Sequence, residues 1–267
     1  MLASIFALES GRAITYSHST TAIFLPMLVQ PCSQRINQVM AINHKETALT
    51  QARYQRIAPL YDAMETLAER RYADWRPSLW SRVQGPKVLE VGVGTGKNMP
   101  YYPDGMEVTA IDLTPGMLER AEKFAAKLDV GVDLQLGDVQ MLDFPNESFD
   151  EVVATFVFCS VPDPILGLNE IARVLKPDGR LLMLEHVRSP NIILGPLMDL
   201  LDPLAVRLMG PHINRRTVQT VQQSQLQLEE VREMGGSGIF KLILARSGRE
   251  QNPQLKLSIA LPDNVTE

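Results

Sequence analysis

The amino-acid sequence predicts an α/β protein built on a doubly wound parallel sheet. Between residues 87 and 187, short apolar runs alternate with amphipathic stretches of ten or more residues, a pattern typical of parallel strands joined by right-handed helical crossovers. Residues 151–154 read Glu-Val-Val-Ala, which suits a strand covered by helices on both faces. The length of 267 residues favours one large domain with extensions, since a typical domain has roughly 150 residues.

The apolar periods place the strands and helices of this core in chain order. We expect strands at residues 87–91, 108–111, 132–136, 149–156 and 180–187, and helices at residues 116–128 and 165–175. Pro177-Asp178-Gly179 predicts a turn that ends the second helix. Further on, the sequence Gly235-Gly236-Ser237-Gly238 predicts a hairpin loop between strands at residues 226–234 and 239–246.

Residues 46–80, before the core, have a helical pattern. Their apolar residues recur at steps of three and four and predict one stripe: Ala52, Ile57, Leu60, Met64 and Leu67. Pro59 is expected to kink or divide this segment, and Pro77 to begin another short turn or helix.

The first 45 residues differ in composition from the rest of the chain. No charged residue lies between Ala13 and Gln34, and the apolar run at residues 22–29 is too short to cross a bilayer. We expect a disordered extension. Two alternatives remain: a start of the protein at Met40, or an acid-poor, Ser-rich sequence in residues 1–40 that targets an organelle.

Composition argues against several classes of function. The 26 Lys and Arg against 31 Asp and Glu give a net charge of −5, so nothing predicts binding to nucleic acid. The two cysteines, Cys32 and Cys159, do not form a disulfide framework, which fits a reducing cytoplasm. Four histidines without cysteine partners at ligand spacing predict no metal site.

A glycine cluster follows the first expected strand, in the sequence Gly92-Val93-Gly94-Thr95-Gly96. Glycines there let the backbone turn sharply and approach a ligand closely, while the amides of the next helix face an anionic group. A dinucleotide-binding loop needs glycine where Lys97 stands, and a phosphate-binding loop needs Ser or Thr where Asn98 stands. The spacing therefore disfavours a nicotinamide dehydrogenase. A tight strand–helix turn without a ligand is the alternative.

Two aspartates follow the next strands. Asp112 ends the second strand, twenty residues after Gly92, where a carboxylate accepts hydrogen bonds from ribose hydroxyls. Asp138 follows the third strand and could accept a hydrogen bond from an adenine amino group. Each alone also fits a helix cap or a turn. Together with the glycines they fall at the carboxyl ends of successive strands, the edge where open α/β sheets bind ligands.

These motifs resemble those of class I S-adenosylmethionine-dependent methyltransferases, in the branch of ubiquinone/menaquinone-type and phospholipid N-methyltransferases. The resemblance runs from about Tyr54 to Arg246. It rests on residues 90–96 (EVGVGTG), 110–118 (AIDLTPGML), 137–139 (GDV), 149–153 (FDEVV) and 174–180 (VLKPDGR). Val93 departs from the pattern, because many relatives carry Cys or Ser there. The resemblance implies a Rossmann-like seven-stranded sheet in the order 3-2-1-4-5-7-6, with the last strand antiparallel and helices on both faces.

The resemblance also implies how the cofactor, S-adenosylmethionine, would meet the chain. The backbones of Gly92, Gly94 and Gly96 would line its methionyl part, and Glu90 would orient its ammonium group. Phe156, after the fourth strand, would lie near the sulfonium.

On the adenosine side, the same resemblance implies four contacts. Asp112 would hold the ribose hydroxyls, with Leu113 packed on the adenine. Asp138 and the backbone amide of Val139 would read the edge of the adenine.

Methyl transfer requires mainly the alignment of nucleophile, methyl group and sulfur, and the exclusion of water. We therefore expect no catalytic dyad in the sequence. His186, at the end of the fifth strand, is the candidate catalytic residue, because it could deprotonate or position an acceptor. A hydrogen-bonded structural histidine is the alternative.

Two segments are implied to face the acceptor. One is the N-terminal lid helix with Tyr54 and Tyr61, and the other is an insertion in which the apolar residues 192–209 meet His212 and Arg215. An apolar wall that ends in arginines suits a lipid-like amphiphile with an anionic head, such as a phospholipid or a quinone precursor, and peripheral contact with a membrane. A helical cover with solvated arginines is the alternative.

The expected methyltransferase domain spans residues 46–246, with lid helices at 46–82, a cofactor core at 86–187 and a substrate-cap insertion at 188–222. Residues 247–267 form a C-terminal tail. We expect a cytoplasmic enzyme that transfers a methyl group to a small or amphiphilic acceptor. A non-catalytic scaffold that binds the cofactor is the alternative, since a fold does not fix a function.

Overall fold

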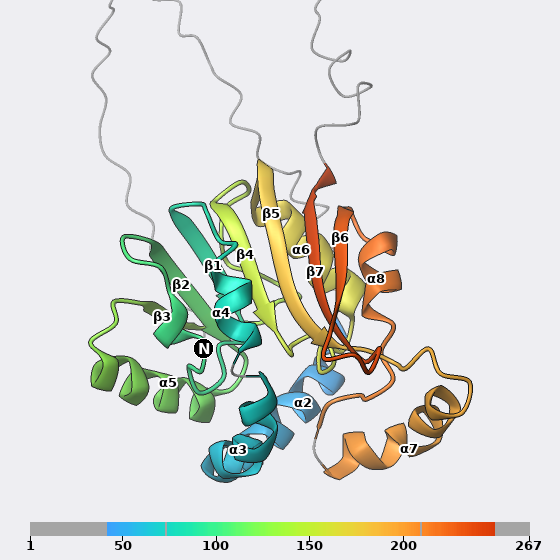
Figure 1. Cartoon of the computed structure of the whole chain (residues 1–267). Coiled ribbons are helices and arrows are strands. Elements are labelled where there is room, and N and C mark those ends of the chain that lie inside the picture. Colours follow the sequence, from blue (N-terminus) through green and yellow to red (C-terminus); the bar gives the residue numbers. More distant parts are fainter. Residues whose placement is uncertain (1–41, 73, 209, 249–267) are drawn as a thin grey trace, which may run out of the picture.

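Seven strands form one sheet in the order β3-β2-β1-β4-β5-β7-β6 (Figure 1). The computed structural model describes residues 42–248 except 73 and 209, so the expectations for residues 1–41 and 249–267 lie outside the described residues. The strands are β1 Lys87–Val91, β2 Glu107–Asp112, β3 Asp133–Leu136, β4 Phe149–Thr155, β5 Leu175–His186, β6 Leu226–Met234 and β7 Phe240–Ser247. Strands β1 to β5 pair in parallel, whereas β7 runs antiparallel to both β5 and β6. The expected order and the antiparallel last strand are confirmed.

Helices connect the strands and extend the chain at both ends of the core. They are α2 His44–Ile57, η1 Ala58–Leu60, α3 Tyr61–Tyr72, α4 Trp75–Trp80, η2 Met99–Tyr101, α5 Pro115–Leu128, α6 Pro164–Val174, α7 Leu194–Leu208 and α8 Thr217–Gln223. Helix α6 begins where the Asp163 side chain accepts a hydrogen bond from the Leu166 amide at 3.0 Å, and Pro164 takes the first helical position. Among the described residues, no helix combines the length and apolar character that a bilayer crossing requires.

The core lies on both faces of the sheet. Successive residues of β1 point to opposite sides, so Leu89 joins the cluster that includes residues of α6 and α8, and Val88 joins the cluster that includes residues of α4. Helix α5 packs with β2 through a third cluster, which contains Ala110 and Ala121. Since helices cover both faces, the carboxyl ends of the strands are left as the edge where a ligand site can form.

The hairpin prediction is confirmed, because β6 and β7 flank the loop of glycines that begins at Gly235. The residues of the turn expected at Pro177-Asp178-Gly179 fall within the bounds of β5, where they pair with no residue of β4. Strand β5 already begins at Leu175, directly after α6, and its register against β4 shifts between Phe149 and Glu151. An irregular strand pairing therefore accommodates the three residues that the sequence assigned to a free turn.

The apolar stripe expected before the core is not buried against the sheet. The 3-10 helix η1, which contains Pro59, separates α2 from α3, as expected of a proline. However, Leu60 is 63% exposed and Met64 is 50% exposed, and none of the residues of α2 is buried. The side chain of Leu67 lies outside the described residues. Helix α2 begins two residues before the expected domain boundary at Glu46.

Candidate active site

A cleft lies at the carboxyl ends of β1 to β4, with about 760 Å³ of empty space when its part open to solvent is included. Its walls contain segments that follow these four strands, together with residues of α2 and α3. The lining residues are Thr50, Tyr54, Tyr61, Gly92, Gly94, Ile111, Asp112, Leu113, Thr114, Met117, Gly137, Asp138, Val139, Thr155, Phe156, Val157, Ser160, Val161 and Pro162. A cleft of this size at this edge is typical of a small-molecule site.

The glycine loop has a left-handed backbone at each of its three glycines. Gly92 has φ +68°, and a Cβ there would lie 2.5 Å from a methyl carbon of Val157. A Cβ at Gly94, with φ +57°, would meet no atom within 4 Å, so this residue opens directly onto the cleft. A Cβ at Gly96 would instead collide with Met99 at 2.8 Å. Gly96 therefore serves the close packing of the loop and does not line the cleft.

Asp112 connects the end of β2 to the glycine loop. One carboxylate oxygen accepts a hydrogen bond from the Gly94 amide at 2.9 Å, and the other accepts one from the Thr114 amide at 2.8 Å. Burial raises the pKa of Asp112 above its ordinary value, and these backbone hydrogen bonds oppose the shift. The carboxylate thus fixes the loop and lines the cleft at the same time.

Helix α2 covers the cleft beside Leu113. The Gln51 amide group donates to the Leu113 carbonyl at 2.8 Å, and the Gly116 amide donates to the Gln55 side chain at 2.9 Å. Sequence reasoning missed both glutamines. The signal was their four-residue spacing, which puts them on one side of the helix.

Asp138 also lines the cleft and is held by Gln140. The Gln140 backbone amide donates to Asp138 at 2.9 Å, and its side-chain amide lies 3.0 Å from the second carboxylate oxygen. Gln140 is itself buried and accepts a hydrogen bond from the Asp163 amide. The carboxylate of Asp138 and the apolar Val139 both line the cleft.

Glu90 is placed below the cleft and does not line it. Its carboxylate accepts hydrogen bonds from the Tyr102 hydroxyl and from the Asn98 side chain, the latter at 2.7 Å. Burial raises the pKa of Glu90 above its ordinary value. Asn98 also donates to Thr155, which lines the cleft, and accepts from Arg76 on α4. This network connects Glu90 to Thr155 in the lining of the cleft.

The segment after β4 begins at Phe156, which has a positive φ, and its next two amides bond a buried carboxyl, that of Glu185. Phe156 lines the cleft with φ +58°, an uncommon backbone angle for a bulky residue. The Glu185 carboxyl on β5 accepts hydrogen bonds from the amides of Val157 and Phe158 at 2.8 and 2.9 Å. Burial raises the pKa of Glu185 to about 8. Sequence reasoning missed Glu185, although an acidic residue inside an apolar strand was a visible signal.

Tyr54 and Tyr61 both line the cleft, with ring centroids 6.5 Å apart. The Tyr54 hydroxyl lies 2.5 Å from the Ser160 hydroxyl, which ties α2 to the segment after β4. Burial raises the pKa of Tyr54 well above its ordinary value, so the phenol stays protonated. Both tyrosines therefore lie where a molecule in the cleft could contact them.

Two histidines meet where the insertion returns to the sheet. The Nε2 of His186 lies 2.9 Å from the His212 carbonyl oxygen, so this nitrogen carries the proton and donates. Burial lowers the pKa of His186. The Nδ1 of His212 lies 2.8 Å from the buried Asp202 carboxylate, which leaves its Nε2 free of this contact. The His212 side chain is 36% exposed, and its backbone amide donates to the Cys159 carbonyl beside the cleft.

Arg215 holds the cleft wall from outside. Its guanidinium donates to the Val161 carbonyl at 2.9 Å, and its buried Nε lacks a hydrogen-bond partner. Burial lowers the pKa of Arg215. The structure therefore brings Tyr54, Tyr61 and most of the expected cofactor-binding residues to one cleft. The expected site residues that do not line it are Glu90, Gly96, His186, His212 and Arg215.

The residues of the cleft fit S-adenosylmethionine. Asp112 and Asp138 offer carboxylates to hydroxyl and amino groups, Leu113 and Val139 offer apolar surface to a purine, and the bare backbone at Gly94 leaves room for close approach. Fold and site together define an α/β protein that binds a nucleoside-type cofactor at the switch edge of its sheet.

Comparisons with known proteins identify the family. Residues 89–183 match a family model described as a methyltransferase domain. The chain is 34% identical over 164 residues to the phosphatidylethanolamine N-methyltransferase of Cereibacter sphaeroides, covering 60% of this chain and 79% of the relative. It is 34% identical over 188 residues to the thiol S-methyltransferase TMT1B of Rattus norvegicus, covering 62% and 75%.

A solved structure supports the fold. A possible histamine N-methyltransferase from Thermotoga maritima superposes with a TM-score of 0.58 at 21% identity, covering 73% of this chain and 99% of that one. The chain belongs to the class I S-adenosylmethionine-dependent methyltransferases. It is an enzyme that methylates with S-adenosylmethionine as its cofactor.

Proposed function

We propose that the methyl acceptor is an amphiphile whose reactive group enters the cleft while its apolar part lies against the α7 segment. The observation that carries this proposal is that residues 210–215, which follow α7, pack against Tyr54 and Val161 in the wall of the cleft. Gly210 lies against the Tyr54 ring, where a Cβ would be 3.4 Å from a ring carbon, and Arg215 bonds the wall residue Val161. The apolar insertion is thereby joined to the cleft, and an amphiphile can contact both.

The names of the relatives support acceptors with either a nitrogen or a sulfur nucleophile. One is named for a phospholipid headgroup and the other for a thiol. Both kinds of nucleophile are available on a lipid-like molecule, so the proposal is stated for an amphiphile with a nitrogen or sulfur acceptor. The proposal also places the protein at the surface of a membrane, as a peripheral protein.

On the cofactor side, the proposed contacts follow the lining of the cleft. S-adenosylmethionine supplies a methyl group already activated by the sulfonium. Asp112 accepts hydrogen bonds from the ribose hydroxyls, and Asp138 accepts one from the adenine amino group. The open backbone at Gly94 receives the methionyl part, and Phe156 packs near the sulfonium and excludes water.

On the acceptor side, we assign the proton-accepting role to His212 in preference to His186. The Nε2 of His186 is engaged as a donor to the His212 carbonyl, and burial keeps its ring neutral. Asp202 accepts from Nδ1 of His212 and so holds the tautomer in which Nε2 can take a proton. Asp202 acts as a positioning residue for this ring.

The acceptor class is tested by methyl transfer to pairs of compounds that share a headgroup and differ in the acyl or alkyl chain. We expect the long-chain phosphatidylethanolamine and the long-chain thiol to be methylated faster than phosphoethanolamine and a short thiol. Equal rates on the chain-free compounds would contradict the proposal.

The role of His212 is tested by the kcat of two substituted chains. His212→Asn should lower kcat about 10²–10⁴-fold, while KM for S-adenosylmethionine stays unchanged. His186→Asn is the matched control and should keep a kcat close to that of the original chain. A loss of kcat in the His186 variant alone would reverse the assignment.

A further inference from the structure

Helix α7 presents most of its large apolar side chains to solvent and buries the polar Asp202. Its buried residues are Gly195, Met198 and Asp202. The exposed large apolar residues of this segment are Ile192, Ile193, Leu194, Leu197, Leu200, Leu201, Leu204 and Leu208. Of these, Ile192 is 87% exposed and Leu200 is 76% exposed. An amphipathic helix of a soluble domain normally has the opposite orientation, so this surface, which we term the α7 face, is fitted for contact with something apolar.

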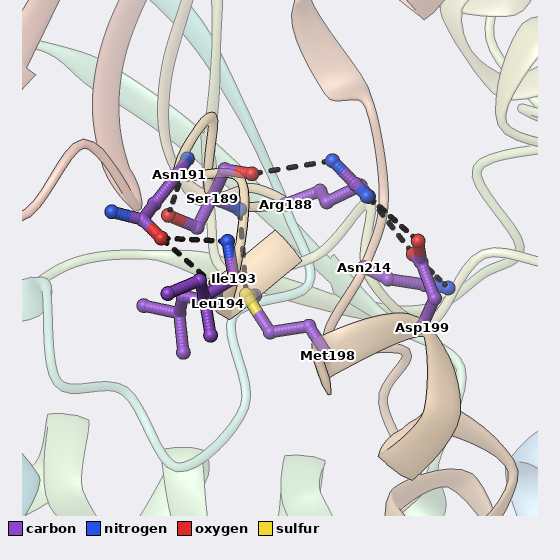
Figure 2. A network of polar contacts seen from close by, with 8 residues as sticks. All are labelled: Arg188, Ser189, Asn191, Ile193, Leu194, Met198, Asp199 and Asn214. Atoms are coloured by element: carbon purple, nitrogen blue, oxygen red, sulfur yellow. Dashed lines mark hydrogen bonds and ion pairs between the residues drawn. The ribbon is translucent and has the colours of Figure 1, made fainter. Parts of the chain in front are cut away.

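Polar contacts hold α7 in this orientation (Figure 2). The Arg188 guanidinium makes an ion pair with Asp199 on α7 at 2.8 Å, and the Asn214 amide donates to the same carboxylate. At the start of the helix, the Asn191 side chain accepts from the amides of Ile193 and Leu194 at 2.9 and 3.0 Å. The contacts of Arg188 and Asn214 join Asp199 of α7 to residues outside the helix, so specific contacts hold the orientation in which the leucines are exposed.

The α7 face lies at the same end of the molecule as the cleft. In Figure 1, α7 and α3 both project beyond the end of the sheet at which the arrowheads of β2 and β4 lie, which is the end with the cleft. The exposed Leu60 and Met64 of η1 and α3 add apolar surface at that end. A partner on this surface would therefore lie at the same end of the molecule as the cleft.

The charge around the α7 face differs from that of the chain as a whole. Residues 188–216 contain four arginines and two aspartates, although the full chain has a net charge of −5. Asp199 is paired with Arg188 and Asp202 with His212, whereas Arg207 and Arg216 are exposed. Exposed leucines flanked by arginine are complementary to an apolar layer with anionic groups at its surface, which is the chemistry of an anionic lipid bilayer.

The helix is too short to cross such a layer. Its 15 residues span about 22 Å, against about 30 Å for the hydrocarbon core of a bilayer. We propose that the α7 face docks in the plane of an anionic lipid surface, with the leucines in the interface and Arg207 at the headgroups. This docking rests on the proposed function, because it delivers an amphiphile held in the same surface to the cleft.

The experiment is co-sedimentation of the full chain with vesicles of phosphatidylcholine and phosphatidylglycerol, and with vesicles of phosphatidylcholine alone. We expect binding that is stronger to the anionic vesicles. Leu200→Gln and Leu204→Gln should each weaken it about tenfold, since each removes an apolar side chain from the interface. Arg207→Gln should weaken binding to the anionic vesicles only. Val231→Gln, the same kind of change at another exposed apolar residue, should leave binding unchanged.

Two results would overturn the proposal. One is vesicle binding that Leu200→Gln and Leu204→Gln leave unchanged. The other is a concentration-dependent dimer in analytical ultracentrifugation that Leu200→Gln abolishes while vesicles are not bound, which would make the α7 face an interface between two copies. S-adenosylmethionine binding reports on folding of each variant. A methylation assay with a detergent-dispersed acceptor distinguishes failure of the docking proposal from failure of the proposed function. Methylation of this acceptor can persist in a variant that no longer binds vesicles.

Discussion

Removal of the Asp112 carboxylate tests the assignment of the cofactor cleft most directly. In the structure this group accepts from the amides of Gly94 and Thr114 and lines the cleft. Asp112→Ala removes the proposed acceptor of the ribose hydroxyls and also frees the Gly94 amide, which holds the glycine loop. Hydrogen bonds of this kind, made by a charged group, contribute about 1–3 kcal/mol. We therefore expect the Kd for S-adenosylmethionine to rise roughly 5- to 150-fold.

Isothermal titration calorimetry at neutral pH measures this change. Asp112→Asn keeps one oxygen that can accept from a loop amide, so we expect a smaller loss of affinity than for alanine. Asp104→Ala, at an exposed position before β2, is the control and should not change the Kd. If Asp112→Ala binds the cofactor as tightly as the original chain, the ribose has been placed at the wrong strand end.

Three other changes test the cleft and its supports. Because burial raises the pKa of Glu185 to about 8, the folded chain keeps a proton that the unfolded chain loses above its ordinary pKa of about 4.5. The free energy of unfolding should thus fall by about 1.4 kcal/mol per pH unit as pH rises from about 4.5 to about 8. Glu185→Gln should abolish this pH dependence, which urea unfolding at several pH values measures. Gly92→Ala should destabilise the fold by about 1–3 kcal/mol and weaken cofactor binding, owing to the contact with Val157 and the positive φ; thermal unfolding that matches the original chain would contradict this. Arg76→Met should cost about 1–3 kcal/mol in urea unfolding, because it removes the ion pair to Glu69 and the hydrogen bond to Asn98, while Lys97 stays 3.6 Å from Glu69; a cost below about 0.5 kcal/mol would show that these contacts add little.

The sheet could be predicted from the sequence because its strands are covered on both faces. The expected bounds of β1 and β6 agree with the structure, β2 is one residue longer than expected at each end, and β3 begins one residue later than expected. Continuous apolar runs that end at glycine or aspartate leave little choice of secondary structure. The glycine loop and the aspartates at strand ends were identifiable for the same reason, since topology alone brings successive strand ends together.

Periodicity and motifs predicted less well which way a side chain points. The spacing of Leu60 and Met64 predicted one apolar stripe, and both side chains are exposed, because apolar spacing reports only that residues share a face. Likewise, a motif places Glu90 next to the glycine loop, while its actual partners, Asn98 and Tyr102, come from a later segment. Such contacts depend on tertiary packing, which no local pattern encodes.

Helix α2, which covers the cleft, is held to the core in an unusual way. Helix α2 buries none of its own residues and is joined to the core by polar contacts such as those of Gln51, Tyr54 and Gln55. Each hydrogen bond of this kind is worth about 0.5–1.5 kcal/mol, so detaching the helix costs only a few kcal/mol and leaves the main core intact. We therefore expect the demethylated cofactor to leave when α2 detaches from the core. Amide hydrogen exchange in α2 should be faster than in β1 and should slow when a ligand binds.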